Sequence, residues 1–250
     1  VHNLGKNFSK AFEIEFEKRD GSRGLAYQTC YGFGYSRVLA AIIAQHGDDR
    51  GLVLPPIVSP IQVVIIPIPF KGQEEEIMDY ASEIKKLLEK KWRTTLDDRK
   101  DVTPGEKFYH WELMGVPVRI EVGPKEVAES TVTIARRDTL ERVKVRLDEL
   151  ESKVEELMNS IISNLRERSI RMMMGLIGDA KSIDEVKKLL KERRIARIEW
   201  CGSVECAEKL KEKAGGEIRG ERYDIAERPK NSCIVCGREA KKVVYVARAY

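Results

Sequence analysis

The sequence has 250 residues, of which 42% are hydrophobic and 34% are charged; this composition excludes a disordered chain and allows two or three folded domains. Its 45 basic and 41 acidic residues leave a net charge of +4, so any contact with nucleic acid has to come from local basic patches. The most hydrophobic run, residues 61–70, is interrupted by Pro67 and Pro69, so we expect no membrane span, and we expect no signal peptide.

The first part of the chain predicts strands, a turn and a helix. Alternation over residues 11–17 predicts a strand, and the glycines within residues 21–24 predict a turn. Small apolar residues over 38–46 predict a helix that stops at Gly47. The pair Pro55 and Pro56 continues neither helix nor sheet, so we place a boundary there and a first domain over residues 1–56.

The middle part, residues 57–170, alternates between strand and helix patterns, which predicts an α/β domain with a mixed sheet. The expected strands are residues 62–66, 116–122 and 131–136, and the expected helices are residues 74–91 and 104–114. Thr103, Pro104 and Glu106 together form a capping box with proline at the first helical position, so the second helix should begin at Pro104.

Apolar residues at heptad spacing between Leu140 and Ile161 suggest a coiled coil. Residues 142–146, however, alternate charged and apolar side chains, which favours a strand paired with residues 131–136. We therefore expect the helix to begin near Leu147, to run to about residue 168 and to pack on its own domain rather than on a partner helix.

The last part, residues 171–250, is predicted as a small α+β domain that binds metal. After Gly175 and Gly178, a capping box at residues 182–185 opens another helix that runs to Arg194. Four cysteines form two close pairs, C-x4-C and C-x2-C: Cys201, Cys206, Cys233 and Cys236.

Two such pairs can each chelate one side of a zinc ion, and together they complete a closed, structural, tetrahedral site. Disulfides are the alternative, but five cysteines are too few for a secreted disulfide scaffold and point to a reducing cytoplasm. Cys30, which has no neighbouring cysteine, is expected to be a small buried hydrophobic residue.

Residues 28–37 read QTCYGFGYSR, a glycine–apolar–glycine strand that ends in an arginine at the start of a helix. This pattern resembles the third signature motif of class II aminoacyl-tRNA synthetases. Glycines let a flat purine lie against the strand backbone, and a planar guanidinium can stack on adenine and meet phosphate charge. A strand-to-helix turn without a ligand is the alternative for this pattern taken alone.

Further segments resemble prolyl-tRNA synthetases of the archaeal and eukaryotic-cytoplasmic type, in order over nearly the whole chain: residues 2–10, 46–56, 109–117, 119–124, 136–138 and the cysteine-containing end. The resemblance implies that Arg37 is the catalytic arginine, that Gly34, Ser36 and Arg37 bind ATP, and that His2 lines the proline site. It also implies that the carboxylate of Tyr250 approaches the catalytic domain, for which the end of a strand is the alternative.

The resemblance makes the middle domain an anticodon-binding domain. There the carboxylate of Glu121 would accept hydrogen bonds from an unstacked guanine. Phosphate and base contacts around it are implied for Arg119, Lys125, Arg136 and Arg137. The alternative is that these charges only solvate one face of the sheet.

The function implied by the resemblance is proline–tRNA ligation, in which ATP with Mg²⁺ activates proline and the product is transferred to tRNA(Pro). Residues 1–56 would be the end of the antiparallel catalytic sheet of a class II enzyme, and the full-length enzyme would be a homodimer in the cytoplasm. Because the chain opens on Val1, we expect a cut N-terminus and catalytic incompleteness. The alternatives are a non-catalytic tRNA- or RNA-binding module and, less well supported, a zinc-dependent interaction protein.

Overall fold

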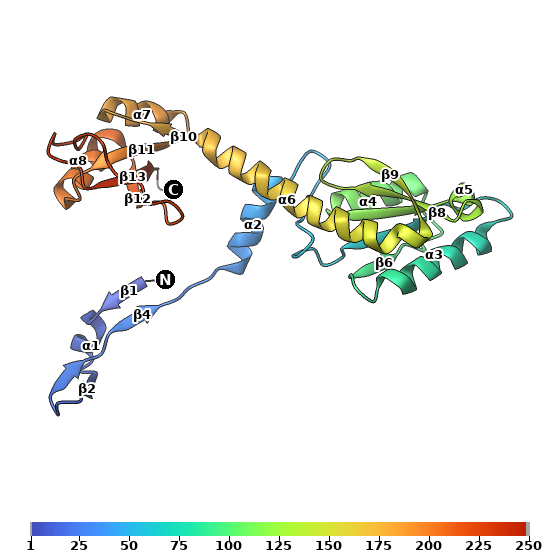
Figure 1. Cartoon of the computed structure of the whole chain (residues 1–250), viewed down its shortest axis with the longest axis horizontal. Coiled ribbons are helices and arrows are strands. Elements are labelled where there is room, and N and C mark those ends of the chain that lie inside the picture. The colour runs from blue at the N-terminus through green and yellow to red at the C-terminus, as the bar shows by residue number, and fades with distance from the viewer. Residues whose placement is uncertain (1, 249–250) are drawn as a thin grey trace. The chain divides into compact units, whose positions relative to one another are not determined.

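A computed structural model describes residues 2–248 of the chain (Figure 1). The chain divides into two compact units, Val1–Met158 and Asn159–Tyr250, and each is described by itself. No helix within residues 2–248 is both long and apolar enough to cross a membrane.

The first residues form two short antiparallel strand pairs and two helices. Strand β1 (His2–Gly5) pairs with β4 (Gln28–Cys30), and β2 (Glu15–Glu17) pairs with β3 (Arg23–Leu25). Helix α1 (Asn7–Ala11) lies between β1 and β2 in the chain, so the predicted strand over residues 11–17 was wrong for its first half. Glu13, at a φ of 53°, reverses the chain after α1, and strand geometry begins only at Glu15.

Helix α2 (Tyr35–His46) confirms the predicted helix before Gly47, whose N–H donates to the carbonyl of Ile43. It begins earlier than expected because Gly34 is its extended N-cap, which places Ser36 and Arg37 in the first turn. Cys30 is exposed at the end of β4, so its predicted burial was wrong. The reason is that all three residues of β4 are exposed in this two-stranded sheet.

The middle of the chain forms the predicted α/β arrangement around a five-stranded mixed sheet with strand order β6-β5-β7-β8-β9. Its strands are β5 (Val63–Pro67), β6 (Thr94–Leu96), β7 (Val118–Val122), β8 (Thr131–Arg136) and β9 (Arg142–Arg146). Strand β5 is parallel to β6 and β7, whereas β7, β8 and β9 are antiparallel to one another. The predicted pairing of residues 142–146 with residues 131–136 is confirmed.

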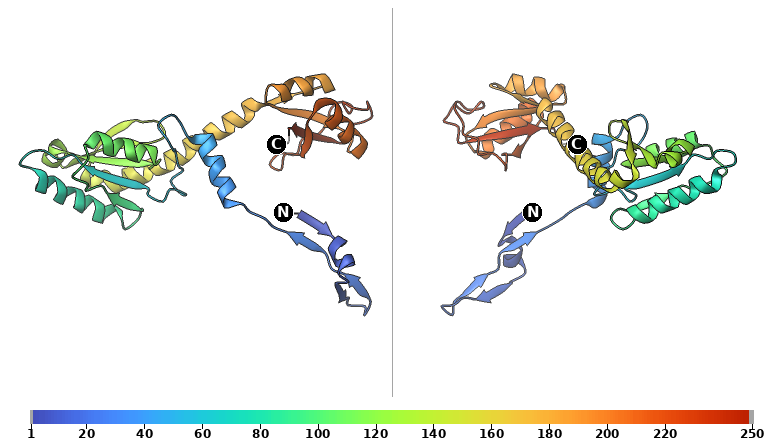
Figure 2. Two further views of the ribbon diagram at one scale, coloured as in Figure 1. Left: turned by 180° about the vertical axis from the view of Figure 1, so that it is seen from behind. Right: turned by 45° about the vertical axis from the view of Figure 1, so that its right-hand side comes forward.

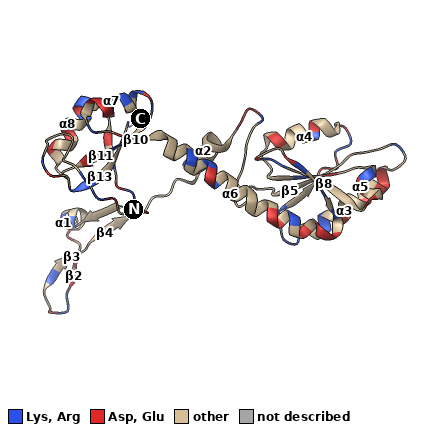
Figure 3. Cartoon of the chain, turned by 45° about the horizontal axis from the view of Figure 1, so that its top comes forward, with Lys and Arg blue, Asp and Glu red and all other residues tan. Residues whose placement is uncertain are grey.

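Helices α3 (Glu74–Leu88) and α4 (Pro104–Leu113) lie on opposite faces of this sheet (Figure 2). All five residues of β5 are buried, and Val64 and Ile66 pack with Phe108 and Trp111 of α4. The predicted capping box of α4 is confirmed, since Thr103 and Glu106 each accept the backbone N–H of the other. Charges of both signs lie on α3 (Figure 3), with acidic residues in its first turn and lysines in its last turn, as the helix dipole favours.

A short 3₁₀ turn (Leu147–Glu149) leads into the long helix α6 (Leu150–Leu176). Its buried residues recur at helical spacing: Leu150, Val154, Leu157, Met158, Ile161 and Leu165. The helix continues past the predicted end at residue 168, because the methionines at 172–174 are good helix formers. Gly175 is accommodated within the helix, and the boundary between the two compact units falls inside α6.

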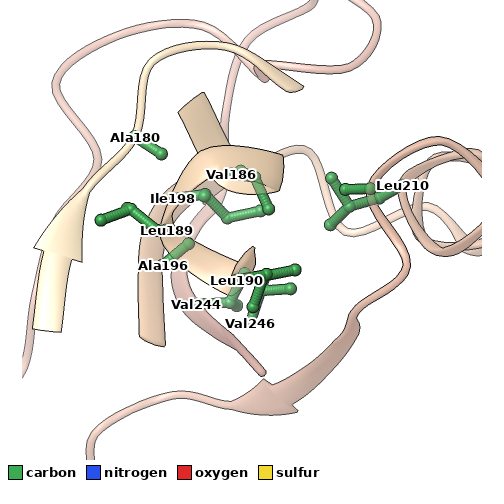
Figure 4. Close-up of a cluster of buried hydrophobic side chains, with 10 residues drawn as sticks. Ala180, Val186, Leu189, Leu190, Ala196, Ile198, Leu210, Val244 and Val246 are labelled. Carbon is green, nitrogen blue, oxygen red and sulfur yellow. The ribbon is translucent and has the colours of Figure 1, made fainter. Parts of the chain in front are cut away.

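The second unit contains a four-stranded sheet with strand order β10-β11-β13-β12. Its strands are β10 (Ile177–Asp179), β11 (Ile195–Trp200), β12 (Glu217–Gly220) and β13 (Lys242–Ala247), and its helices are α7 (Ile183–Lys191) and α8 (Val204–Ala214). The two helices and the sheet enclose one core, in which Val186, Leu190, Ile198, Leu210 and Val244 are buried (Figure 4).

Ser182 caps α7 as predicted, with its hydroxyl accepting from Glu185 N at 3.2 Å. The reciprocal bond differs from the prediction, since the Glu185 carboxylate accepts from Lys181 N instead of from Ser182 N. The helix ends at Lys191 and not at Arg194, because Arg193 takes a left-handed φ of 59° and turns the chain into β11.

Candidate nucleic-acid interface and metal centre

A cavity of about 260 Å³ opens beside strands β7 and β8. Arginines dominate its lining, together with one glutamate, one tryptophan and small apolar side chains: Arg50, Trp111, Glu112, Val116, Arg119, Ala135, Arg136, Arg137, Leu140 and Arg142. We call this cavity the arginine pocket. Its residues come from the chain after α2, from α4, and from the three adjacent strands β7, β8 and β9.

Arg119 lies at the centre of an ion-pair network in the arginine pocket. Its Nε is 3.0 Å from a carboxylate oxygen of Glu121, and its Nη1 is 2.9 Å from a carboxylate oxygen of Glu112. The guanidinium also lies 4.3 Å from the centre of the Phe108 ring, a cation–π contact. Glu121, whose side chain is only 3% exposed, accepts a second ion pair from Arg142.

Arg136 and Arg137 are also fixed by carboxylates. Arg136 forms a bidentate pair with Asp138, with distances of 2.8 and 2.7 Å. Arg137 is buried, with 2% of its side chain exposed, and pairs in bidentate fashion with Asp48 at 2.8 and 2.6 Å. The structure thus brings Arg119, Arg136 and Arg137 to one cavity, whereas Lys125 lies exposed on helix α5 (Pro124–Ala128) outside its lining.

Two carboxylates that pair with these arginines, Asp48 and Glu112, have lowered pKa values. The side-chain hydrogen bond from Arg137 lowers the pKa of Asp48 to about 2. Burial alone would raise the pKa of Glu112, but hydrogen bonds from Arg119 and Arg50 lower it below its usual value. Planar donors and charged acceptors are therefore held in fixed geometry around one cavity, an arrangement that suits the hydrogen-bonding edge of an unstacked base.

Sequence reasoning missed four charged or aromatic residues of this site: Arg50, Trp111, Glu112 and Arg142. Arg50, Trp111 and Glu112 lie in segments that resemble prolyl-tRNA synthetases. The resemblance of a whole segment did not indicate which of its residues would line a cavity. Arg142 was predicted only as part of a strand. Its position could have been found from the register, because Ala135 beside Arg136 pairs directly with it.

The residues expected to bind ATP and proline lie in the first part of the chain. Ser36 and Arg37 share the first turn of α2, Gly34 caps it, and all three are exposed. His2 is exposed in β1 and pairs with Cys30 of β4, the strand that leads toward α2. Tyr250 lies outside the described residues.

The four clustered cysteines of the second unit lie together as predicted, with all four Sγ atoms within 4.8 Å of one another. The Sγ atoms of Cys236 and Cys201 are 3.8 Å apart. A tetrahedral zinc site with Zn–S bonds of about 2.3 Å requires sulfur atoms about 3.8 Å apart, whereas a disulfide requires about 2.05 Å. All five cysteines are free thiols, so the donor set fits a metal ion and not a disulfide pair.

Local backbone geometry holds these sulfur atoms in place. Ser203 caps α8 by accepting from Cys206 N at 3.3 Å, which fixes the first pair. The second pair lies in a tight turn closed by a 2.9 Å bond from Gly237 N to the Cys233 carbonyl, with Gly237 at a φ of 71°. The Arg238 side chain donates to Cys236 Sγ at 3.4 Å and lowers the pKa of that thiol to about 6.

Two family descriptions match the chain: "Anticodon binding domain" over residues 62–157, and "Prolyl-tRNA synthetase, C-terminal" over residues 183–250. Among curated relatives, proline–tRNA ligases of Ignicoccus hospitalis and Pyrococcus horikoshii are 44% and 46% identical to it, and one of Saccharolobus islandicus is 43% identical. Each match covers 100% of this chain but 52% to 53% of the relative. The chain therefore spans about half the length of the curated relatives that it matches.

Proposed function

We propose, from the premise that this chain belongs to the prolyl-tRNA synthetase family, that it is part of a proline–tRNA ligase of the cytoplasm. The enzyme activates proline with ATP and transfers it to tRNA(Pro). The observation that carries this proposal is identity of 43% to 46% along the whole chain to proline–tRNA ligases. It is supported by the arginine pocket, whose lining residues other than Arg50 lie inside the anticodon-binding match.

For proline activation, we propose that Arg37 stacks on adenine and meets phosphate charge, with Ser36 and Gly34 beside the nucleotide and His2 against proline. Their placement supports this assignment, since Gly34, Ser36 and Arg37 share one exposed helix start. An added Cβ at Gly32 would meet no atom within 4 Å, so the backbone before α2 is open to a flat ring. Mg²⁺ would supply charge neutralisation on the phosphates, and the protein supplies positioning.

For tRNA recognition, we propose that Glu121 and Arg119 read a guanine of the anticodon and that Arg136 and Lys125 contact the RNA around it. The pairing of Glu121 with Arg119 and Arg142 supports this role, because two arginines converge on a carboxylate that is only 3% exposed. Arg137 was also expected to contact RNA, but its three hydrogen bonds go to Asp48 and to the Glu112 carbonyl. We therefore assign Arg137 to holding the pocket in place.

We propose a division into a catalytic portion over residues 1–56, an anticodon-binding domain over 57–170 and a zinc domain over 171–250. The zinc ion would be structural, held by all four thiolates of the cysteine cluster with no open position for chemistry. The strand pairs β1–β4 and β2–β3 would then be the end of the antiparallel class II sheet. As in the family expectation, the full-length enzyme would be a homodimer.

The test is aminoacylation of tRNA(Pro) with labelled proline by the full-length protein, together with proline-dependent ATP–pyrophosphate exchange. We expect both reactions, and Arg37→Ala should lower exchange by about a hundredfold or more. A non-catalytic RNA-binding module is the second candidate, because the arginine pocket is a built cavity whereas the ATP residues are all exposed. Tight binding of tRNA(Pro) without either reaction would favour that second candidate.

A further inference from the structure

A short segment after helix α2 lies against the anticodon-binding domain. We call this segment, residues 47–54, the strap. Leu52 N donates to the Leu113 carbonyl at 3.0 Å, and Leu54 N donates to the Gly115 carbonyl at 3.4 Å. Val53 and Leu54 are buried. The strap therefore follows the end of α4 through backbone hydrogen bonds.

Two glycines allow this close approach. An added Cβ at Gly51 would lie 2.5 Å from the Cα of Leu113, and one at Gly115 would lie 2.7 Å from the carbonyl oxygen of Leu52. Both glycines also have positive φ angles, 128° and 72°. The backbones touch where side chains would separate them, so the position of the strap is tightly specified.

An ion pair between Asp48 and the buried Arg137 also holds the strap in place. Asp48 accepts two hydrogen bonds from Arg137, and the Nε of Arg137 donates to the Glu112 carbonyl at 2.9 Å. Since the Arg137 side chain is nearly fully buried, its two terminal nitrogens would lose these acceptors if Asp48 were lost, and only the Nε bond to the Glu112 carbonyl would remain. The pair fixes the strap two residues before Arg50.

Arg50 is the residue that the strap brings to the arginine pocket. Its Nη1 lies 3.1 Å from one carboxylate oxygen of Glu112, whose other oxygen accepts from Arg119. The Arg50 side chain is 53% exposed, so its remaining donors face solvent at the rim of the cavity. The match to the anticodon binding domain begins at residue 62, so Arg50 lies outside it.

We propose that Arg50 is an RNA-binding residue that contacts a backbone phosphate of the tRNA anticodon loop, and that Asp48 is a positioning residue which holds the strap through Arg137. The arginine pocket is then completed by a segment from outside the anticodon-binding domain. Glu112 orients the Arg50 guanidinium through one edge and leaves the other donors for the phosphate, as a bidentate guanidinium contact requires. This inference rests on the proposed function, because it names a further contact at the same RNA site.

The experiment measures the affinity of the full-length protein for an unmodified tRNA(Pro) transcript over a range of salt concentrations. Arg50→Ala should weaken binding about tenfold and lower the salt slope by about one, as loss of one charged phosphate contact does. Arg50→Lys should recover part of the affinity and all of the slope. The control is Arg146→Gln, which removes an equal charge from the far end of β9, where the arginine side chain is 70% exposed.

Asp48→Asn tests the positioning role in the same assay. It should weaken binding about as much as Arg50→Ala, and the double variant should be no weaker than either single variant, because both act through one contact. Amide hydrogen exchange of Leu52 and Leu54 should become faster in Asp48→Asn and stay unchanged in Arg50→Ala. This measurement distinguishes a displaced strap from the loss of the phosphate contact alone. Binding of Arg50→Ala equal to that of Arg146→Gln, or additive losses in the double variant, would overturn the inference. A wild-type protein that does not bind tRNA(Pro) would instead contradict the proposed function.

Discussion

The sulfur atoms of Cys201 and Cys236 lie 3.8 Å apart although the two residues are 35 positions apart in the sequence. One cysteine follows β11 and the other lies in the turn before β13, and the antiparallel pairing of these strands brings the two together. The cysteine cluster therefore links the loop before α8 to the loop before the last strand.

This arrangement predicts about one zinc ion per chain in protein purified under reducing conditions. Cys206→Ala should lower the zinc content and destabilise the second unit, since metal binding in such sites contributes folding free energy. Elemental analysis and thermal unfolding check both effects. Cys30→Ala is the control, because Cys30 is exposed and lies outside the cluster. Fully reduced protein that contains no metal, without exposure to chelators, would contradict the assignment.

A second prediction concerns Glu121. Glu121→Ala should cost about 1 to 3 kcal/mol in binding tRNA(Pro), while a tRNA with altered anticodon guanines should be affected much less. Filter binding with the two transcripts measures the difference. The control is Glu129→Ala, an exposed acid of the same domain that pairs with Lys144. Equal losses for both transcripts would show that Glu121 only supports the fold.

A further prediction is that protonation of Asp97 lowers the stability of the fold at acid pH. Burial would raise its pKa, but hydrogen bonds from Arg99 and Trp111 and the charge of Lys107 hold it at about 2, below the usual 3.8. A lowered folded-state pKa means that the stabilisation is complete above about pH 4 and is lost as the pH falls toward 2. With 1% of the side chain exposed, the contribution is about 2 kcal/mol.

Urea unfolding at a series of pH values measures this effect. In Asp97→Asn the loss of stability between pH 4 and pH 2 should be smaller by about 2 kcal/mol than in the wild type. An unchanged pH dependence would show that Asp97 is not the titrating group. The variant should also be less stable at pH 7, because Lys107 is buried beside it.

Gly115→Ala should destabilise the first unit by about 2 kcal/mol or more, since the position combines a φ of 72° with backbone atoms that a Cβ would overlap. Gly72→Ala is the matched control. Gly72 has a φ of 87° but open space around its Cα, so only the backbone strain of about 1 kcal/mol applies there. Thermal unfolding measures the stability of both variants. Equal losses of stability would mean that the chain near Leu52 moves to accommodate the added Cβ at no cost in free energy.

The sequence predicted the middle domain well because its signals are local. Strand β5 is a continuous apolar run, and the capping box at Thr103 marks the start of α4 without reference to any distant residue. Alternation in residues 142–146 correctly outweighed the heptad spacing. Errors lie at α1, at Cys30 and at the ends of α6 and α7. The turn at Glu13 and the left-handed φ of Arg193 are single-residue backbone features that no periodicity predicts.

The two candidate sites also differ in how far local sequence signals predict them. The metal cluster could be predicted because ligand spacing alone specifies it, and the four cysteines do lie together. The arginine pocket could be predicted only in part. Its ion pairs join residues as far apart as Asp48 and Arg137, and no periodicity in the sequence reports which carboxylate will meet which guanidinium.

Helix α6 begins in one compact unit and ends in the other, with no break along its 27 residues. Gene fragments that end near Met158 would therefore sever a helix whose buried positions continue on both sides of the cut, at Leu157 and Ile161. Neither fragment cut at that point would retain the whole helix, so we expect neither to fold as an independent domain. A division of the chain that keeps this helix whole, together with its buried positions in the first unit, lies after Leu176.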